Sequence, residues 1–60
     1  MRLVPLLLQL ERRPGPLRSQ VLAALAPHGR PLRWAITAVT PAGPDGTGAT
    51  RLQIEAVVLT

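Results

Sequence analysis

Arginine is the residue type in this 60-residue chain whose number and spacing best suit the binding of a ligand. All seven basic residues are arginine, three residues are acidic, and the formal net charge is +4. A guanidinium group can bind a carboxylate or a phosphate through two parallel hydrogen bonds. Arg12, Arg13 and Arg18 flank the start of a predicted helix, where free backbone N–H groups also favour anions. We interpret these three residues as a candidate anion-binding site, with a solvated loop as the simpler alternative.

The other polar side chains do not form a catalytic or metal-binding pattern. The chain has no cysteine, which excludes a disulfide and a thiolate metal site. One histidine, His28, and the carboxylates of Glu11, Asp45 and Glu55 are too few to build a metal site on their own. His28 lies at a predicted helix end, where a structural role explains it. The sequence therefore predicts a protein that is not an enzyme and has no metal and no cofactor.

Four segments have the periodicity of regular secondary structure. Residues 3–11 alternate as a strand does, and Pro5 places this strand at the edge of a sheet. Residues 16–26 repeat apolar side chains at helical spacing, and Pro16 suits the first helical position. Residues 32–40 and 50–60 are rich in β-branched residues and alternate with a period of two. The glycine-rich segment 41–49 precedes a strand and lacks a Gly-Lys-Ser/Thr ending, so we predict a hairpin loop rather than a phosphate-binding loop.

The order of these segments predicts one small α+β domain over residues 1–60. The expected fold is β-α-β-β, a three-stranded antiparallel sheet with one helix packed on one face, which is half of a ferredoxin-like motif. The favoured strand order is 1-3-2, with the last strand between the other two. The order 1-2-3, in which the first two strands run parallel, is the alternative.

Alternation divides the predicted strands into two faces. The more apolar set lies beneath the helix and includes the one aromatic residue, Trp34, which we expect in the core. In the second strand this set consists of Leu32, Trp34, Ile36 and Ala38. The opposite face carries Arg33, Ala35, Thr37 and Val39 from the second strand and the alternate residues of the third.

The face away from the helix is too apolar for an ordinary wet face of an antiparallel sheet. Hydrophobic residues make up 47% of the chain and the mean hydropathy is +0.23, although a domain of this size can bury only about 60% of its unfolded surface. Self-association is a usual remedy for so small a core. We therefore predict a homodimer interface, or a surface for another protein, at this face or at the edge of the first strand. The candidate interface residues are Leu3, Leu7, Ala35, Val39, Val57 and Leu59.

Weak, charge-driven binding to nucleic acid is the alternative function that the composition leaves open. Sheets that recognise single-stranded RNA stack bases on exposed aromatic residues, and this chain offers none if Trp34 is internal. Residues 1–13 contain too short an apolar stretch to span a bilayer, and no cleavage site follows them. We expect a cytoplasmic protein with no membrane partner.

Overall fold

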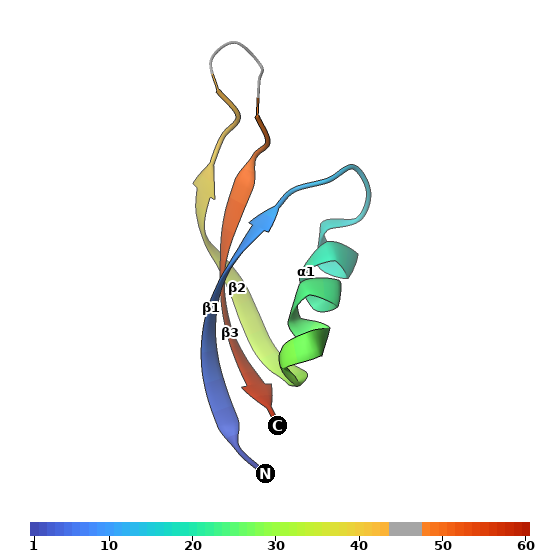
Figure 1. The fold of residues 1–60 in the computed structure, drawn as a ribbon, viewed down its shortest axis with the longest axis vertical. Coiled ribbons are helices and arrows are strands. Elements are labelled where there is room, and N and C mark those ends of the chain that lie inside the picture. The colour runs from blue at the N-terminus through green and yellow to red at the C-terminus, as the bar shows by residue number, and fades with distance from the viewer. Residues whose placement is uncertain (44–47) are drawn as a thin grey trace.

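The structure is a computed structural model that describes residues 1–43 and 48–60 (Figure 1). The first strand is β1 (Leu3–Glu11), the helix is α1 (Leu17–Leu25), and a short 3-10 turn, η1 (Ala26–His28), follows it. The last two strands are β2 (Arg30–Thr40) and β3 (Arg51–Leu59). The predicted loop between them falls partly on residues 44–47, which lie outside the described residues.

The three strands form one antiparallel sheet in the order β1-β3-β2. This confirms the predicted β-α-β-β fold and its favoured strand order, and excludes the arrangement with parallel neighbours. β1 pairs with β3 without interruption from Leu3 opposite Leu59 to Glu11 opposite Arg51. The helix lies across one face of this sheet, so the molecule has two layers (Figure 1).

Pro5 lies on the free edge of the sheet, as its residue type predicts. Arg2 and Thr60 exchange two backbone hydrogen bonds, of 3.0 and 2.9 Å. Pairs of this kind alternate along an antiparallel ladder with pairs that exchange none. Because Pro5 is three residues from Arg2, it belongs to the second kind, and its nitrogen faces the free edge. The missing N–H group therefore costs the sheet no hydrogen bond.

The other edge strand, β2, departs from regular pairing at two places. Pro31 and Arg33 lie opposite the consecutive residues Val58 and Val57, so Leu32 is an extra residue between them. Thr37 is a second extra residue, between Ile36 and Ala38. A bulge leaves one residue unpaired and reverses the alternation beyond it.

The core lies between the helix and the central strand. Val21 and Leu25, four residues apart on α1, are fully buried, as their spacing on one helix face predicts. The buried residues of β3 are Leu52, Ile54, Ala56 and Val58. Trp34 is partly buried and packs against this cluster, which confirms the prediction that it faces the helix.

The single helix is too short to cover the sheet. A helix of nine residues is about 13 Å long, whereas strands of nine residues extend for about 30 Å. The side chains of β1 that face the helix are therefore only half-buried. The radius of gyration is 12.6 Å, against about 10.4 Å for a compact chain of this length. The chain thus leaves much apolar surface in contact with water.

The described part of the chain contains no helix with both the length and the apolar character that crossing a membrane requires.

Gly29 joins η1 to β2 in a conformation that only glycine adopts easily. Its φ is +142°, and a Cβ atom would lie 2.7 Å from the backbone oxygen of Leu59. We expect Gly29→Ala to lower the free energy of unfolding by about 2–4 kcal/mol, because strain and a backbone clash add. Gly48→Ala is the matched control, since φ is +79° there and nothing lies within 4 Å. Urea unfolding, followed by Trp34 fluorescence at one protein concentration, measures the free energy of unfolding of both variants. An equal loss of stability in Gly29→Ala and Gly48→Ala would contradict the role of the clash.

Gln20 ties the connection between β1 and α1 to the helix. Its side-chain oxygen accepts a hydrogen bond from the backbone N–H of Arg13 at 2.9 Å, and its amide donates to the Arg13 oxygen at 2.7 Å and to the Gly15 oxygen at 3.3 Å. We expect Gln20→Ala to lower the free energy of unfolding by about 1–2 kcal/mol, because water replaces part of what is lost. Ser19→Ala, at the exposed neighbouring position, should change it by less than about 0.5 kcal/mol. The same urea titration compares them, and no difference between the two variants would show that these hydrogen bonds do not stabilise the fold.

Candidate interaction surface

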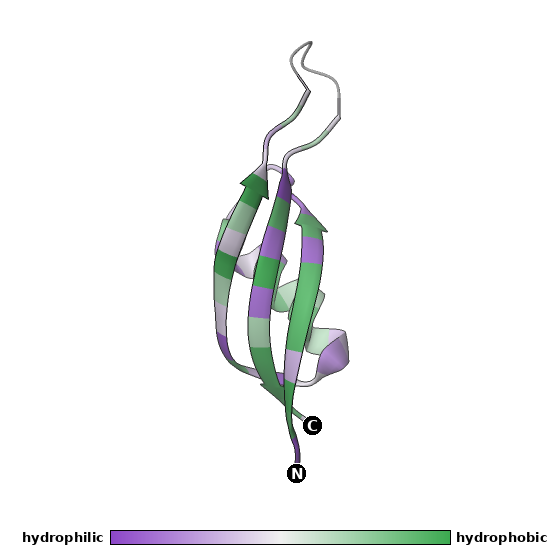
Figure 2. Cartoon of the chain, turned by 90° about the vertical axis from the view of Figure 1, so that its left-hand side faces the viewer, coloured by the Kyte–Doolittle hydropathy of each residue, from purple (hydrophilic) through white to green (hydrophobic). Residues whose placement is uncertain are grey.

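The sheet face opposite the helix is open (Figure 2), and we call it the open face. Residues directly opposite each other in an antiparallel sheet point to the same side, so the open face consists of five cross-strand rows. Listed from β1 through β3 to β2, the rows are Leu3–Leu59–Arg30, Pro5–Val57–Arg33, Leu7–Glu55–Ala35, Gln9–Gln53–Ala38 and Glu11–Arg51–Thr40. On β1 and β3 the aliphatic residues gather at one end of this face and most polar residues at the other, while β2 contributes Arg30 and Arg33 to the apolar end.

The apolar end is the most exposed hydrophobic area of the sheet. Leu3 is 66% exposed and Leu7 is 62% exposed, while Val57 and Leu59 are half-buried beside them on β3. Pro5 lies between the two leucines on β1 and is also exposed. We call these five residues the open-face patch. It contains four of the six predicted interface residues, and Ala35 lies in the row of Leu7.

Val39 is the predicted interface residue that the structure places elsewhere. The extra residue Thr37 reverses the alternation, so Val39 lies opposite Leu52 in the register of the helix side. Val39 is still 58% exposed, because the short helix does not cover that end of the sheet. The same bulge moves Ala38 to the open face, opposite Gln53. The expected faces of Val39 and Ala38 are therefore wrong, whereas Arg33, Trp34, Ala35 and Ile36 lie on the expected faces.

A shallow depression of about 450 Å³ lies where the apolar end meets the first charged residues. Glu55, in the middle of the central strand, contributes a carboxylate to its wall, and Arg33 contributes a guanidinium group from the next row. The residues around the depression are Pro5, Leu6, Arg33, Trp34, Ala35, Glu55, Ala56 and Val57. The open face thus combines exposed aliphatic side chains with one acidic and one basic residue in adjacent rows. Alternation along each strand assigned Arg33 and Glu55 to this face. It could not show that they lie in adjacent rows, because that depends on the register between β2 and β3.

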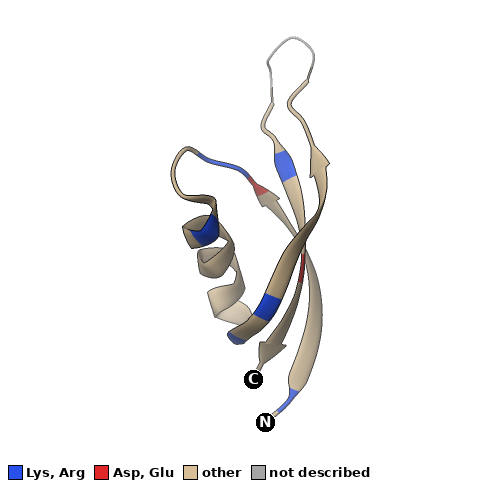
Figure 3. Ribbon diagram, turned by 180° about the vertical axis from the view of Figure 1, so that it is seen from behind, with Lys and Arg blue, Asp and Glu red and all other residues tan. Residues whose placement is uncertain are grey.

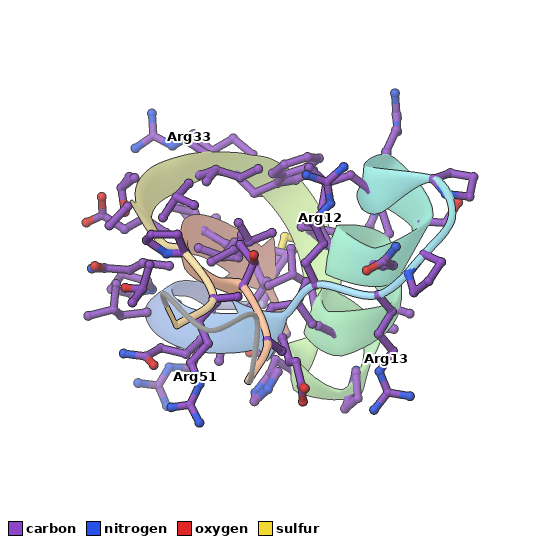
Figure 4. All side chains as sticks on the ribbon, turned by 90° about the horizontal axis from the view of Figure 1, so that it is seen from above. Arg12, Arg13, Arg33 and Arg51 are labelled. Atoms are coloured by element: carbon purple, nitrogen blue, oxygen red, sulfur yellow. The ribbon has the colours of Figure 1, made fainter. Side chains whose placement is uncertain are left out.

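The predicted anion site is not a converging set of arginines. Arg12 and Arg13 line a depression of about 250 Å³ with Pro14, Gly15 and Thr50, and Arg18 is not among its lining residues. Viewed from above, the side chains of Arg12 and Arg13 point in different directions (Figure 4). Gln20 engages the Arg13 backbone, which fixes the loop and not the guanidinium group. Of the three predicted residues, Arg12 and Arg13 thus line one depression, but their side chains do not point toward a common position.

The basic residues as a whole are spread over the molecule. Figure 3 shows them on the strands, on the connection before α1 and on the helix. Arg33 and Arg51 point away from each other and from Arg13 (Figure 4). Binding to a nucleic-acid backbone requires several cations on one side. On the open face Arg30 and Arg33 lie in adjacent rows, while Arg51 lies at the opposite end of the face. Within residues 1–43 and 48–60, no side chains of His, Asp or Glu form a group that could hold a metal ion.

Comparison with known proteins places the chain in a family. Residues 2–60 match the model of a family described as a domain of unknown function (DUF8621). The curated proteins and the solved structures contain no match to this chain. Because the family match runs from the residue before β1 to the end of the chain, it includes the whole open face. The chain is a member of the DUF8621 family of domains of unknown function.

Proposed function

We propose that this chain is a protein-interaction module without catalytic activity of its own, and that it forms a homodimer through its open face. The observation that carries the proposal is the open-face patch, in which Leu3 and Leu7 are 66% and 62% exposed beside the aliphatic residues of β3. Exposed aliphatic side chains gathered in this way mark interaction sites. A second copy offers the same patch to the first.

The small core supports self-association. Six residues form the buried core of the described structure: Val21, Leu25, Leu52, Ile54, Ala56 and Val58. Two layers, one short helix on a three-stranded sheet, leave the other face of the sheet without a packing partner. Two copies stacked through their open faces would form a helix–sheet–sheet–helix arrangement, with the two sheets about 10 Å apart. That arrangement covers apolar area that the monomer leaves in water.

The face suits an interface better than either edge does. Pro5 removes a hydrogen-bond donor from the free edge of β1, and two bulges interrupt β2. Prolines and bulges are features that protect sheet edges from pairing with another strand. Of the two surfaces that the sequence left open, the structure therefore favours the face. Nucleic-acid binding has less support, because the arginines are dispersed (Figure 3).

The proposal predicts different effects for two equally exposed aliphatic residues. Leu7→Gln removes part of the open-face patch from both copies, whereas Val39→Gln changes a residue in the register of the helix side. Losing the burial of Leu7 costs about 2 kcal/mol per dimer, which raises the dimer Kd roughly thirtyfold. We expect Val39→Gln to change the Kd less than about threefold.

Sedimentation equilibrium over a wide range of protein concentration measures these constants, and circular dichroism checks that both variants fold. A wild-type chain that stays monomeric at the highest concentration would overturn the proposal. Dimerisation that Val39→Gln weakens as much as Leu7→Gln would place the interface on another surface. A shift of labelled RNA or duplex DNA at low salt would instead support the nucleic-acid alternative.

A further inference from the structure

We propose that the two copies pack with their strands antiparallel, and that Glu55 of each copy pairs with Arg33 of the second copy. This inference rests on the proposed function and specifies the chemistry of its interface. Glu55 lies at the centre of the open face, between Leu7 on β1 and Ala35 on β2. Arg33 lies one row away, opposite Val57. Both side chains line the depression of about 450 Å³.

The size of the face requires that these charges lie inside the interface. Three strands of nine residues, spaced about 4.8 Å apart with a rise of about 3.3 Å per residue, present about 430 Å² in plan. Two copies therefore contribute roughly 900 Å² before side-chain relief is counted, which approaches the roughly 1,000 Å² that a specific interface needs. The open-face patch alone is much smaller. A stable dimer must extend beyond this patch into the rows of Glu55 and Arg33.

Covering Glu55 has an electrostatic consequence. Removing a carboxylate from water without a cationic partner costs far more free energy than the burial of one exposed leucine contributes. The residues beside Glu55 in its own row are Leu7 and Ala35, and neither can compensate the charge. A partner that covers this face can compensate the charge by presenting a cation above the centre of β3. The open face itself carries such a group, in Arg33.

Two-fold symmetry allows two alignments of stacked sheets, and charge distinguishes them. An axis parallel to the strands places each row on its own copy, so the two Glu55 carboxylates meet and repel. An axis across the strands reverses the order of the rows. When this axis passes between the rows of Glu55 and Val57, each Glu55 lies over Val57 and beside Arg33 of the second copy. Leu7 then lies over Pro5, while Leu3 and Leu59 lie over Gln9 and Gln53 of the second copy. Four of the five rows overlap, and the contacts between Leu7 and Pro5 form together with both ion pairs.

Charge reversal followed by mixing tests this arrangement. Arg33→Glu and Glu55→Arg each place like charges together at both symmetric positions, so each variant alone should show a dimer Kd at least about tenfold above wild type. An equimolar mixture of the two variants restores opposite charges at both positions of the mixed dimer. We expect the mixed dimer to form with a Kd within about threefold of wild type. Arg18→Glu, an equal change of charge on the exposed helix, is the matched control and should dimerise as wild type does.

The outcomes separate this inference from the proposed function. Wild-type dimers with unaffected single variants would overturn the ion pairs and leave the dimer standing, whereas a monomeric wild type would overturn both. Recovery in the double variant R33E/E55R without recovery on mixing would show that the pair acts within one chain, which also contradicts the inference. If circular dichroism shows that a charge reversal unfolds the chain, Arg33→Gln and Glu55→Gln replace it in a double-mutant cycle on the dimer Kd. Additive effects in that cycle would then overturn the pairing.

Discussion

Burial of the central strand β3 against one short helix is the interaction on which the rest of this structure depends. Val21 and Leu25 cover the helix side of β3, and four alternate residues of that strand are buried beneath them. The same alternation sends the other residues of β3 to the open face. Residues 1–43 and 48–60 contain one α-helix, of nine residues, so the second face receives no cover from this part of the molecule. A single packing event thus produces both the core and the uncovered surface.

Much of the fold follows from local signals in the sequence. Pro5 indicated an edge strand, and the structure leaves its nitrogen at the free edge of β1. Gly29 separates the 3-10 turn η1 from β2, and its positive φ with Leu59 close by explains why a residue without a Cβ atom lies there. β1 begins and ends at the predicted residues, and β2 starts two residues earlier than predicted, at Arg30. These features could be predicted because steric rules at single residues determine them.

The two bulges in β2 could not be predicted in the same way. Neither Leu32 nor Thr37 is a glycine, and no proline lies beside Thr37 to indicate that one residue would drop out of the pairing. A bulge arises when two strands of different length and twist must match over their whole extent, which is a property of the assembled sheet. The face on which Val39 lies depends entirely on the bulge at Thr37. The directions of the arginines near the helix start could not be predicted either, because they depend on the path of the connection between β1 and α1, which hydrogen bonds from Gln20 to Arg13 and Gly15 hold.

The mixed character of the open face has a physical interpretation of its own. A purely aliphatic face would associate with almost any apolar surface, since burial of hydrophobic area has no direction. Glu55 and Arg33 change this, because each charge must meet its opposite before the surrounding surface can leave water. In the dimer that we propose, the aliphatic residues of β1 and β3 supply the free energy of association, and the charges select the partner and its orientation. Because the described residues supply a covering helix on one side of the sheet only, the other face is available in full for such recognition.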